Sequence, residues 1–133
     1  MSSSLTTLQE LAESLHNCQR CPLAKLGRRQ VVFGVGNPHA SVMFVGEAPG
    51  FHEDQKGEPF VGAAGQLLND LLESAGLSRA DIYIANVIKC RPPNNRDPDP
   101  QEVETCKPFL LQQIAMIRPK LVCSLGNWAT QTL

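Results

Sequence analysis

The chain has 133 residues, of which 42% are hydrophobic, and a formal net charge of -1 at neutral pH. This length supports one ordinary core, and the near-neutral charge excludes a globally basic nucleic-acid-binding protein, leaving only local basic groups for such a partner. Met1 to Ser4 has no basic start followed by an apolar core, and no segment approaches the about 18 apolar residues of a membrane helix. We therefore expect one soluble, cytoplasmic, monomeric domain over residues 1–133, without a membrane partner.

A helix and a pair of cysteines are the first predicted features. Apolar residues recur at helical spacing and predict a helix over residues 6–17. It leads to Cys18 and Cys21, a C-x2-C pair closed by Pro22, whose spacing lets two thiolates reach one metal centre. The basic residues that follow, Arg28 among them, are expected on a solvated face.

Three segments of strand and loop come next. Residues 31–33 are expected to form a short strand, and residues 34–38 a turn that lacks the third glycine of a dinucleotide-binding fingerprint. Residues 41–45 are apolar and predict a buried strand. The long connection after it, residues 46–62, holds four acids among glycines and prolines. Such connections usually only turn the chain, but unstructured loops beyond about 12–15 residues are usually functional.

A helix and a second buried strand follow this connection. The helix is expected from residue 61 or 62 until Gly76 ends it. Residues 82–87 are rich in β-formers and predict a strand covered on both faces, with Asn86 at its C-terminal end. The residues expected on the inward helix face are Ala64, Leu67, Leu68, Leu71, Leu72 and Ala75.

The last third of the chain repeats this order. Residues 90–98 are too rich in proline for regular structure, residues 100–117 predict a helix, and residues 121–125 predict a third buried strand. Alternating strands and helices predict parallel βαβ units in a three-layer α/β/α sandwich with a mostly parallel sheet. Ligands of open α/β sheets bind at the carboxyl ends of the strands, where Glu47 and Asn86 would lie.

The five cysteines divide into four and one. Cys18, Cys21, Cys90 and Cys106 could reach one centre, whereas Cys123 lies in an apolar strand, where a thiol behaves as a small hydrophobe. Spacing alone leaves zinc and an iron-sulfur cluster both open, and four unconnected thiols as well.

Several motifs together resemble one family. They are Cys18-x2-Cys21-Pro-Leu, Gly46-Glu47-Ala48-Pro49-Gly50, Glu53-Asp54, Gly57-x-Pro59-Phe60-Val61-Gly62-x-Ala64-Gly65 and Asn86-Val-x-Lys-Cys90-Arg-Pro-Pro-x-Asn95-Arg96. In order and spacing this set is similar to the iron-sulfur (family 4) uracil-DNA glycosylases of bacteria and archaea. The resemblance implies the uracil-DNA glycosylase fold, a [4Fe-4S] cluster on Cys18, Cys21, Cys90 and Cys106, and removal of uracil from single-stranded or mismatched DNA in base-excision repair.

The resemblance also implies roles for individual residues. The amide of Asn86 would read uracil by donating to O4 and accepting from N3–H, an edge that cytosine presents reversed. Phe60 would stack on the flipped base, although a phenylalanine before a helix could equally be core. Glu47 and Glu53 would act as the catalytic or supporting acids. Gly46 and Ala48 would complete the base pocket, with Ala48 standing where other families carry a water-orienting aspartate.

The family continues past this stretch with a further strand and a His-Pro-Ser or His-Pro-Ala motif, whose histidine contacts uracil. His16 and His52 do not match that motif, and Leu133 precedes it, so we expect a C-terminally incomplete domain. Two other functions therefore stay open: a cluster-bound fragment that binds DNA or a nucleobase without turnover, and a zinc-stabilised structural module. Lys89, Arg91 and Arg96 are the local basic residues expected to meet DNA phosphates.

Overall fold

The computed structural model describes residues 8–16, 18, 28–126 and 129–130. In this part of the chain, no helix is long and apolar enough to cross a membrane. Two short 3-10 helices, Arg79–Asp81 and Pro93–Asn95, accompany the main elements. The main elements in chain order are α1 (Leu8–Leu15), β1 (Val35–Gly36), β2 (Val42–Gly46), α2 (Phe51–Lys56), α3 (Ala63–Ser74), β3 (Tyr83–Asn86), α4 (Pro100–Ile117) and β4 (Leu121–Ser124).

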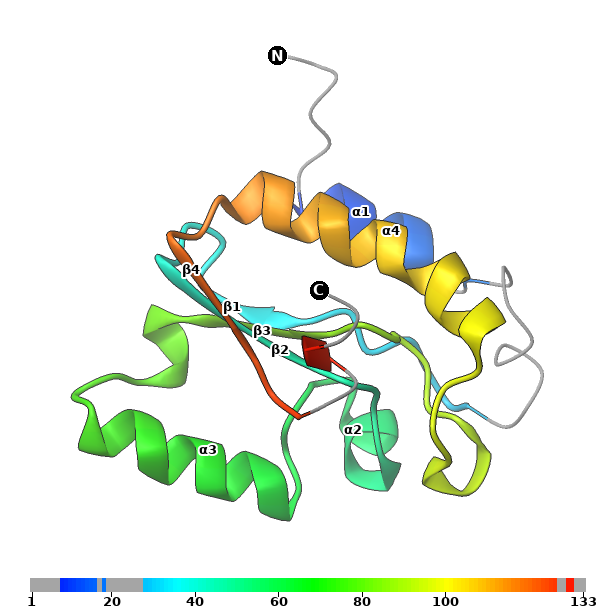
Figure 1. The fold of residues 1–133 in the computed structure, drawn as a ribbon, viewed down its shortest axis with the longest axis horizontal. Coiled ribbons are helices and arrows are strands. Elements are labelled where there is room, and N and C mark those ends of the chain that lie inside the picture. Colours follow the sequence, from blue (N-terminus) through cyan, green and yellow to red (C-terminus); the bar gives the residue numbers. More distant parts are fainter. Residues whose placement is uncertain (1–7, 17, 19–27, 127–128, 131–133) are drawn as a thin grey trace.

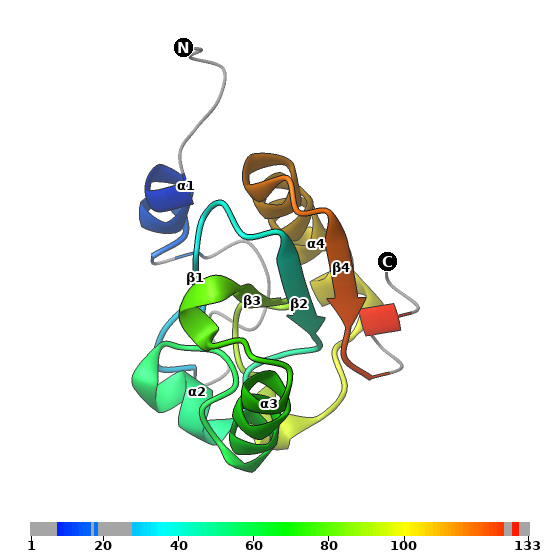
Figure 2. The same ribbon diagram turned by 90° about the vertical axis from the view of Figure 1, so that its left-hand side faces the viewer.

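The four strands form one mixed sheet in the order β1-β3-β2-β4. Strand β2 runs parallel to both β3 and β4, and only β1 is antiparallel to its neighbour β3. Helices α1 and α4 cover one face of the sheet, and α2 and α3 cover the other (Figure 1; Figure 2). The predicted three-layer sandwich with a mostly parallel sheet is therefore confirmed.

Each face of the sheet has its own hydrophobic core, because alternate residues of a strand point to opposite faces. Met43 and Val45 of β2 belong to the larger cluster, which includes Leu110 and Ile117 of α4. Val42 and Phe44, which alternate with them along the strand, pack instead against a second cluster. The buried members of that second cluster are Leu68, Leu72, Ile82 and Ile84.

The first predicted strand is wrong. Residues 31–33 form no strand; the backbone N–H of Val32 donates to the carbonyl oxygen of Lys89 at 2.6 Å, outside the sheet ladder. The short strand β1 lies instead at Val35–Gly36, where a turn was expected. Gly36 makes this possible: its φ is +137°, and a Cβ there would lie 2.1 Å from the carbonyl oxygen of Ile82.

Three further expectations need correction. The connection after β2 is not free of structure, because it contains helix α2. Leu67 and Leu71 of α3 do not face inward but are 60% and 58% exposed. The last strand, β4, is only half-buried because it forms the edge of the sheet, and its Leu121 is 55% exposed.

Helix α4 spans the predicted residues. Asp99 is its N-cap, Glu102 accepts a hydrogen bond from the backbone N–H of Asp99, and Arg118 ends it in the left-handed conformation. Glu102 is 1% exposed and pairs with both terminal nitrogens of Arg96, at 2.9 and 2.7 Å. This pair attaches the proline-rich loop to the start of α4 and so fixes one wall of the site described next.

Candidate functional site

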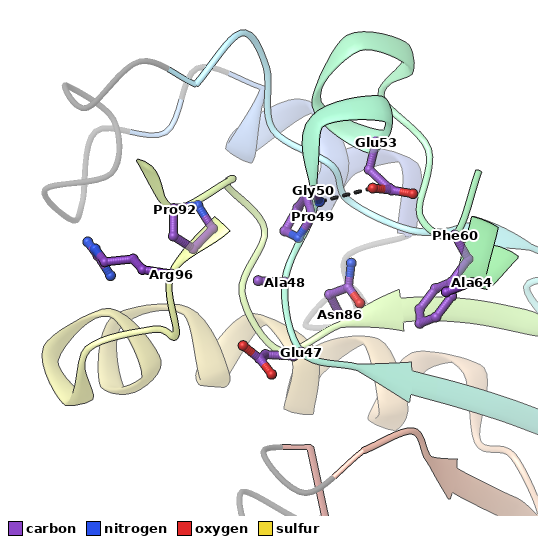
Figure 3. A pocket seen from close by; sticks show the side chains of 10 residues that line it. All are labelled: Glu47, Ala48, Pro49, Gly50, Glu53, Phe60, Ala64, Asn86, Pro92 and Arg96. Carbon is purple, nitrogen blue, oxygen red and sulfur yellow. Dashed lines mark hydrogen bonds between the residues drawn. The ribbon is translucent and has the colours of Figure 1, made fainter. Parts of the chain in front are cut away.

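The candidate site lies where the parallel strands β2 and β3 end. Gly46 and Asn86 are partners across these strands, and pairing continues beyond them, since the N–H of Val87 donates to Gly46 O at 2.9 Å. The two loops that leave the strands thereby start side by side. They enclose a cavity of about 260 Å³ (Figure 3). Its lining residues are Glu47, Ala48, Pro49, Gly50, Glu53, Phe60, Ala64, Asn86, Pro92 and Arg96.

Asn86 presents an unsatisfied polar atom to this cavity. The residue is 2% exposed, and its side-chain Oδ1 has no hydrogen-bond partner within the described part of the chain. Its backbone oxygen accepts a hydrogen bond from Lys89 Nζ at 2.8 Å. A buried amide oxygen without a partner costs about 1–3 kcal/mol, a penalty that a ligand carrying an N–H donor would relieve.

The side chains of Phe60 and Asn86 both lie close to Gly46. A Cβ at Gly46 would lie 2.5 Å from Asn86 Oδ1 and 2.6 Å from the Phe60 ring, so only glycine leaves room for both groups. Phe60 has a φ of +55°, the left-handed region that non-glycine residues rarely adopt. Its ring is half-buried and packs in part against the second core cluster, so Phe60 is both a core residue and a wall of the cavity.

Arg79, which sequence reasoning missed, holds the backbone around Phe60. Its guanidinium donates to the carbonyl oxygens of Pro59, at 3.1 Å, and of Phe60, while its Nε donates to Asn69 Oδ1 at 2.5 Å. Gly65 completes the arrangement, because a Cβ there would lie 1.9 Å from Phe60 O. Arg79 is 19 residues from Phe60, in the turn between α3 and β3, and no local motif indicates this contact.

The carboxylate of Glu53 accepts hydrogen bonds from the backbone around the cavity. One of its oxygens accepts from the N–H of Gly50, and the other accepts from the N–H groups of Val61 and Gly62, each at 3.0 Å. Burial alone would raise the pKa of Glu53, but these backbone donors outweigh it, and the pKa is lowered. The carboxylate thus ties the start of α2 to the start of α3 and stays ionised.

Glu47 and Ala48 line the cavity as the sequence predicted. Burial, followed by the nearby charge of Asp97 and a hydrogen bond with it, raises the pKa of Glu47. Two carboxyl groups in contact favour retention of a proton between them. Gly46 itself does not line the cavity; its contribution is the absence of a side chain.

The basic residues divide differently from the expectation. Arg96 lines the cavity. Arg91 directly precedes Pro92, which is another lining residue. Lys89 is only 2% exposed, however, and donates to Gln113 Oε1 at 2.5 Å, so the expected phosphate contact from Lys89 is wrong. Burial lowers the pKa of Lys89 to about 7, with the Cys106 thiol opposing that shift.

Three of the four predicted cysteine ligands approach one another. Cys18, Cys90 and Cys106 come from three separate segments and line one small cavity of about 10 Å³. Arg28 is not simply solvated but donates from Nη1 to Cys90 Sγ at 3.0 Å. Cys21 lies outside the described residues, and among the described ones no group of three His, Cys, Asp or Glu side chains is arranged to hold a metal ion. The chemistry of these three thiol groups suits a thiolate-bound centre. Cys123 lies apart from these three cysteines in the sequence, in strand β4.

Comparisons with known proteins identify the family of the chain. A family model described as the uracil DNA glycosylase superfamily matches residues 33–133. The chain is 52% identical over 127 residues to a type-4 uracil-DNA glycosylase of Archaeoglobus fulgidus, covering 96% of this chain and 63% of the relative. It is 53% identical over 126 residues to one of Pyrobaculum aerophilum, covering 95% and 64%. More distantly, it is 27% identical over 156 residues to a type-5 uracil-DNA glycosylase of Thermus thermophilus, covering 94% and 71%.

The chain thus spans a little under two thirds of the length of the type-4 relatives, 63% and 64% of the two described above. The matched region nevertheless includes the ends of both central strands and every residue that lines the cavity. The chain therefore belongs to the uracil DNA glycosylase superfamily, and the type-4 enzymes are the members that it matches at about half identity.

Proposed function

We propose that this chain recognises uracil in single-stranded or mismatched DNA and hydrolyses the N-glycosidic bond, releasing uracil as the first step of base-excision repair. The observation that carries this proposal is the buried, unpartnered Oδ1 of Asn86 beside the Phe60 ring, in a cavity of about 260 Å³. Family membership and the names of the relatives support the same activity.

The amide of Asn86 matches the hydrogen-bonding edge of uracil. Its Oδ1 can accept from N3–H of the base, and its Nδ2 can donate to O4. Cytosine offers an acceptor at N3 and an amino donor at C4. With the same amide orientation, Oδ1 would face the acceptor N3 and Nδ2 would face the amino donor, so these buried groups would lack hydrogen bonds. Discrimination against cytosine then follows from the buried position of Asn86.

The reaction requires a flipped nucleotide, because the bond is not accessible inside a base stack. Phe60 supplies an aromatic face for the flipped base. Arg79 and Gly65 hold the backbone of Phe60 in place. Bond cleavage then depends on stabilising the departing uracil anion, to which the Asn86 amide donates at O4. Glu53 acts as a positioning residue, since both its oxygens accept backbone hydrogen bonds.

We further propose a [4Fe-4S] cluster held by Cys18, Cys21, Cys90 and Cys106. Support comes from the shared cavity of the three described cysteines and from the Arg28 guanidinium, whose charge favours a thiolate at Cys90. Such a cluster would join three segments that are distant in the sequence, and its contribution would be structural. The proposed hydrolysis requires no redox chemistry.

A second function is favoured by one observation at the same site. Glu53 is engaged by three backbone N–H groups, and Ala48 carries no carboxylate, so Glu47 is the one remaining acid among the lining residues. Glu47 also shares a hydrogen bond with Asp97, so part of its capacity to hold and orient a water is already engaged. A cluster-bound protein that binds uracil or DNA without turnover is therefore the second candidate.

The experiment is release of free uracil from a single-stranded oligonucleotide with one deoxyuridine, beside matched oligonucleotides carrying deoxycytidine or thymidine. The proposal expects uracil from the first and no base from the others. Retention of the deoxyuridine oligonucleotide without product would support the second candidate. Neither binding nor product would contradict both and would leave a structural module stabilised by zinc.

A further inference from the structure

An exposed aromatic side chain stands beside the uracil cavity without a role in it. Phe51, the first residue of α2, is 50% exposed. The other large hydrophobic residues that the described part of the chain exposes to this extent are leucines, so Phe51 is distinctive as an aromatic. It does not line the cavity.

Phe51 nevertheless lies at the cavity margin. It directly follows Gly50, and the guanidinium carbon of Arg91, which directly precedes Pro92, lies 5.4 Å from the centroid of its ring. Gly50 and Pro92 both line the cavity, and Figure 3 shows Pro92 across it from Phe60 with Gly50 between them. The Phe51–Arg91 pair therefore bridges the two loops that bound the cavity.

The pair is held by its surroundings. Asp54 of α2 is 1% exposed and accepts a hydrogen bond from the backbone N–H of Arg29 at 2.8 Å. Glu53 accepts from the N–H of Gly50, immediately before Phe51. The rings of His52 and Phe51 form a T-shaped pair, with centroids 5.4 Å apart and planes at 84°. The hydrogen bonds of Glu53 and Asp54 hold helix α2 in place, and the half-exposed Phe51 ring has His52 and Arg91 as neighbours.

We propose that Phe51 is a stacking site for a base that flanks the flipped uracil in single-stranded DNA, with the guanidinium of Arg91 lying beside the strand. This inference rests on the proposed function, since it names the next contact along the same substrate. Exposed aromatic rings bind successive bases of single strands without sequence preference, and arginine adds attraction for the phosphates. Phe60 receives the extruded base, and Phe51 receives its neighbour outside the cavity.

The test compares two affinities in the parent chain and in Phe51→Ala. One is the affinity for free uracil, and the other is the affinity for a single-stranded deoxyuridine oligonucleotide with 2-aminopurine on one side of the uracil. Loss of a stacked base predicts about 5- to 150-fold weaker oligonucleotide binding and loss of 2-aminopurine quenching. Affinity for free uracil should be unchanged, because Phe51 lies outside the cavity.

Two matched variants sharpen this comparison. Phe51→Trp keeps an aromatic face and should retain oligonucleotide affinity and quenching. Leu71→Ala removes a similarly exposed apolar side chain, 58% exposed, from α3 and should change neither affinity. Because Phe51 is half exposed, its replacement should leave the chain folded, which the free-uracil affinity confirms directly.

Each outcome decides the inference. Unchanged oligonucleotide affinity in Phe51→Ala overturns it, and so does an equal loss of free-uracil affinity, which would show that Phe51 merely supports the cavity. Both of these results leave the proposed function intact. If the parent chain binds neither uracil nor the oligonucleotide, the proposed function fails and this inference fails with it.

Discussion

Gly46 and Asn86 face each other across the parallel strands β2 and β3, and a methyl group on Gly46 would lie 2.5 Å from Asn86 Oδ1. The same methyl group would lie 2.6 Å from the Phe60 ring. The glycine of the first loop therefore sets the positions of the two side chains that we assign to uracil. Its role is to leave space, which distinguishes it from a residue that contacts the ligand through its own side chain.

Gly46→Ala should displace Asn86 or Phe60 and weaken uracil binding by at least about tenfold, with a loss of stability of about 1–3 kcal/mol from overpacking. Titration calorimetry with uracil and thermal denaturation measure the two effects. Gly76→Ala is the control: Gly76 has a φ of +77°, and a Cβ there meets nothing within 4 Å. It should lower stability only, so equal effects of both variants on uracil affinity would refute the steric argument.

Arg79→Ala should release the carbonyl oxygens of Pro59 and Phe60 and let the Phe60 ring move. We expect about tenfold weaker uracil binding, and little recovery in Arg79→Lys, because an ammonium group cannot reproduce the forked guanidinium. A changed ring-current shift at the Gly46 α-protons would report the ring movement without any ligand. Arg118→Ala, at an exposed residue that ends α4, is the control. If uracil affinity and the Gly46 shift both stay at their parent values, Arg79 does not position Phe60.

Glu53→Gln should lower stability by about 1–3 kcal/mol, because an amide cannot accept from three backbone donors with both of its ends. The lowered pKa of Glu53 adds a pH dependence. Its stabilising contribution is present above the ordinary value of 4.5 and is lost as the pH falls through the lower folded-state value. As the pH is lowered from 7 to 3, the melting temperature should therefore fall less steeply in the variant than in the parent. Glu73→Gln, at an exposed glutamate of α3, should behave like the parent, and a Glu53→Gln curve parallel to that of the parent would contradict the assignment.

The purified protein should contain iron and sulfide. Cys18→Ala and Cys106→Ala should lose both and should melt at least about 4 °C below Cys123→Ala, because a thiolate-bound centre ties separate segments together. Metal and sulfide analysis beside thermal denaturation provides the check. Zinc without sulfide would refute the cluster, and equal melting losses in all three variants would refute the ligand assignment.

The elements that could be predicted from sequence are those fixed by local periodicity and strand order. Helix α4 has the predicted bounds because a proline and a capping box start it and Pro119 follows its end. Asn86 can be placed at the carboxyl end of its strand because it lies at the end of a continuous β-rich run. Parallel strands bring their carboxyl ends together, which places Asn86 beside the loop after β2.

The rest depends on contacts between segments that are far apart in the chain. Nothing in the sequence around Arg79 indicates that it binds the carbonyl of Phe60, and the role of Glu53 as an acceptor of three backbone hydrogen bonds exists only once α2 and α3 are placed. The burial of Lys89 is not predictable from its residue type, because charged residues are rarely buried, whereas here Gln113 and the backbone of Asn86 accept hydrogen bonds from its ammonium group. The exposure of Leu67 is not predictable from the spacing of the leucines in α3, because they cover a wider face of the helix than the part that packs against the sheet.

The central claim, that the Asn86 amide reads uracil, is tested most directly by uracil release and uracil affinity in Asn86→Asp beside the parent chain. A carboxylate cannot donate to O4 and repels the developing uracil anion. Asn37→Asp, at a residue whose Oδ1 accepts from the nearby backbone N–H of His39, controls for the added charge. We predict at least about a hundredfold loss of release or, without turnover, of affinity in Asn86→Asp, corresponding to about 3 kcal/mol, and parent values in Asn37→Asp. Parent values in Asn86→Asp would contradict the account and remove Asn86 from the site.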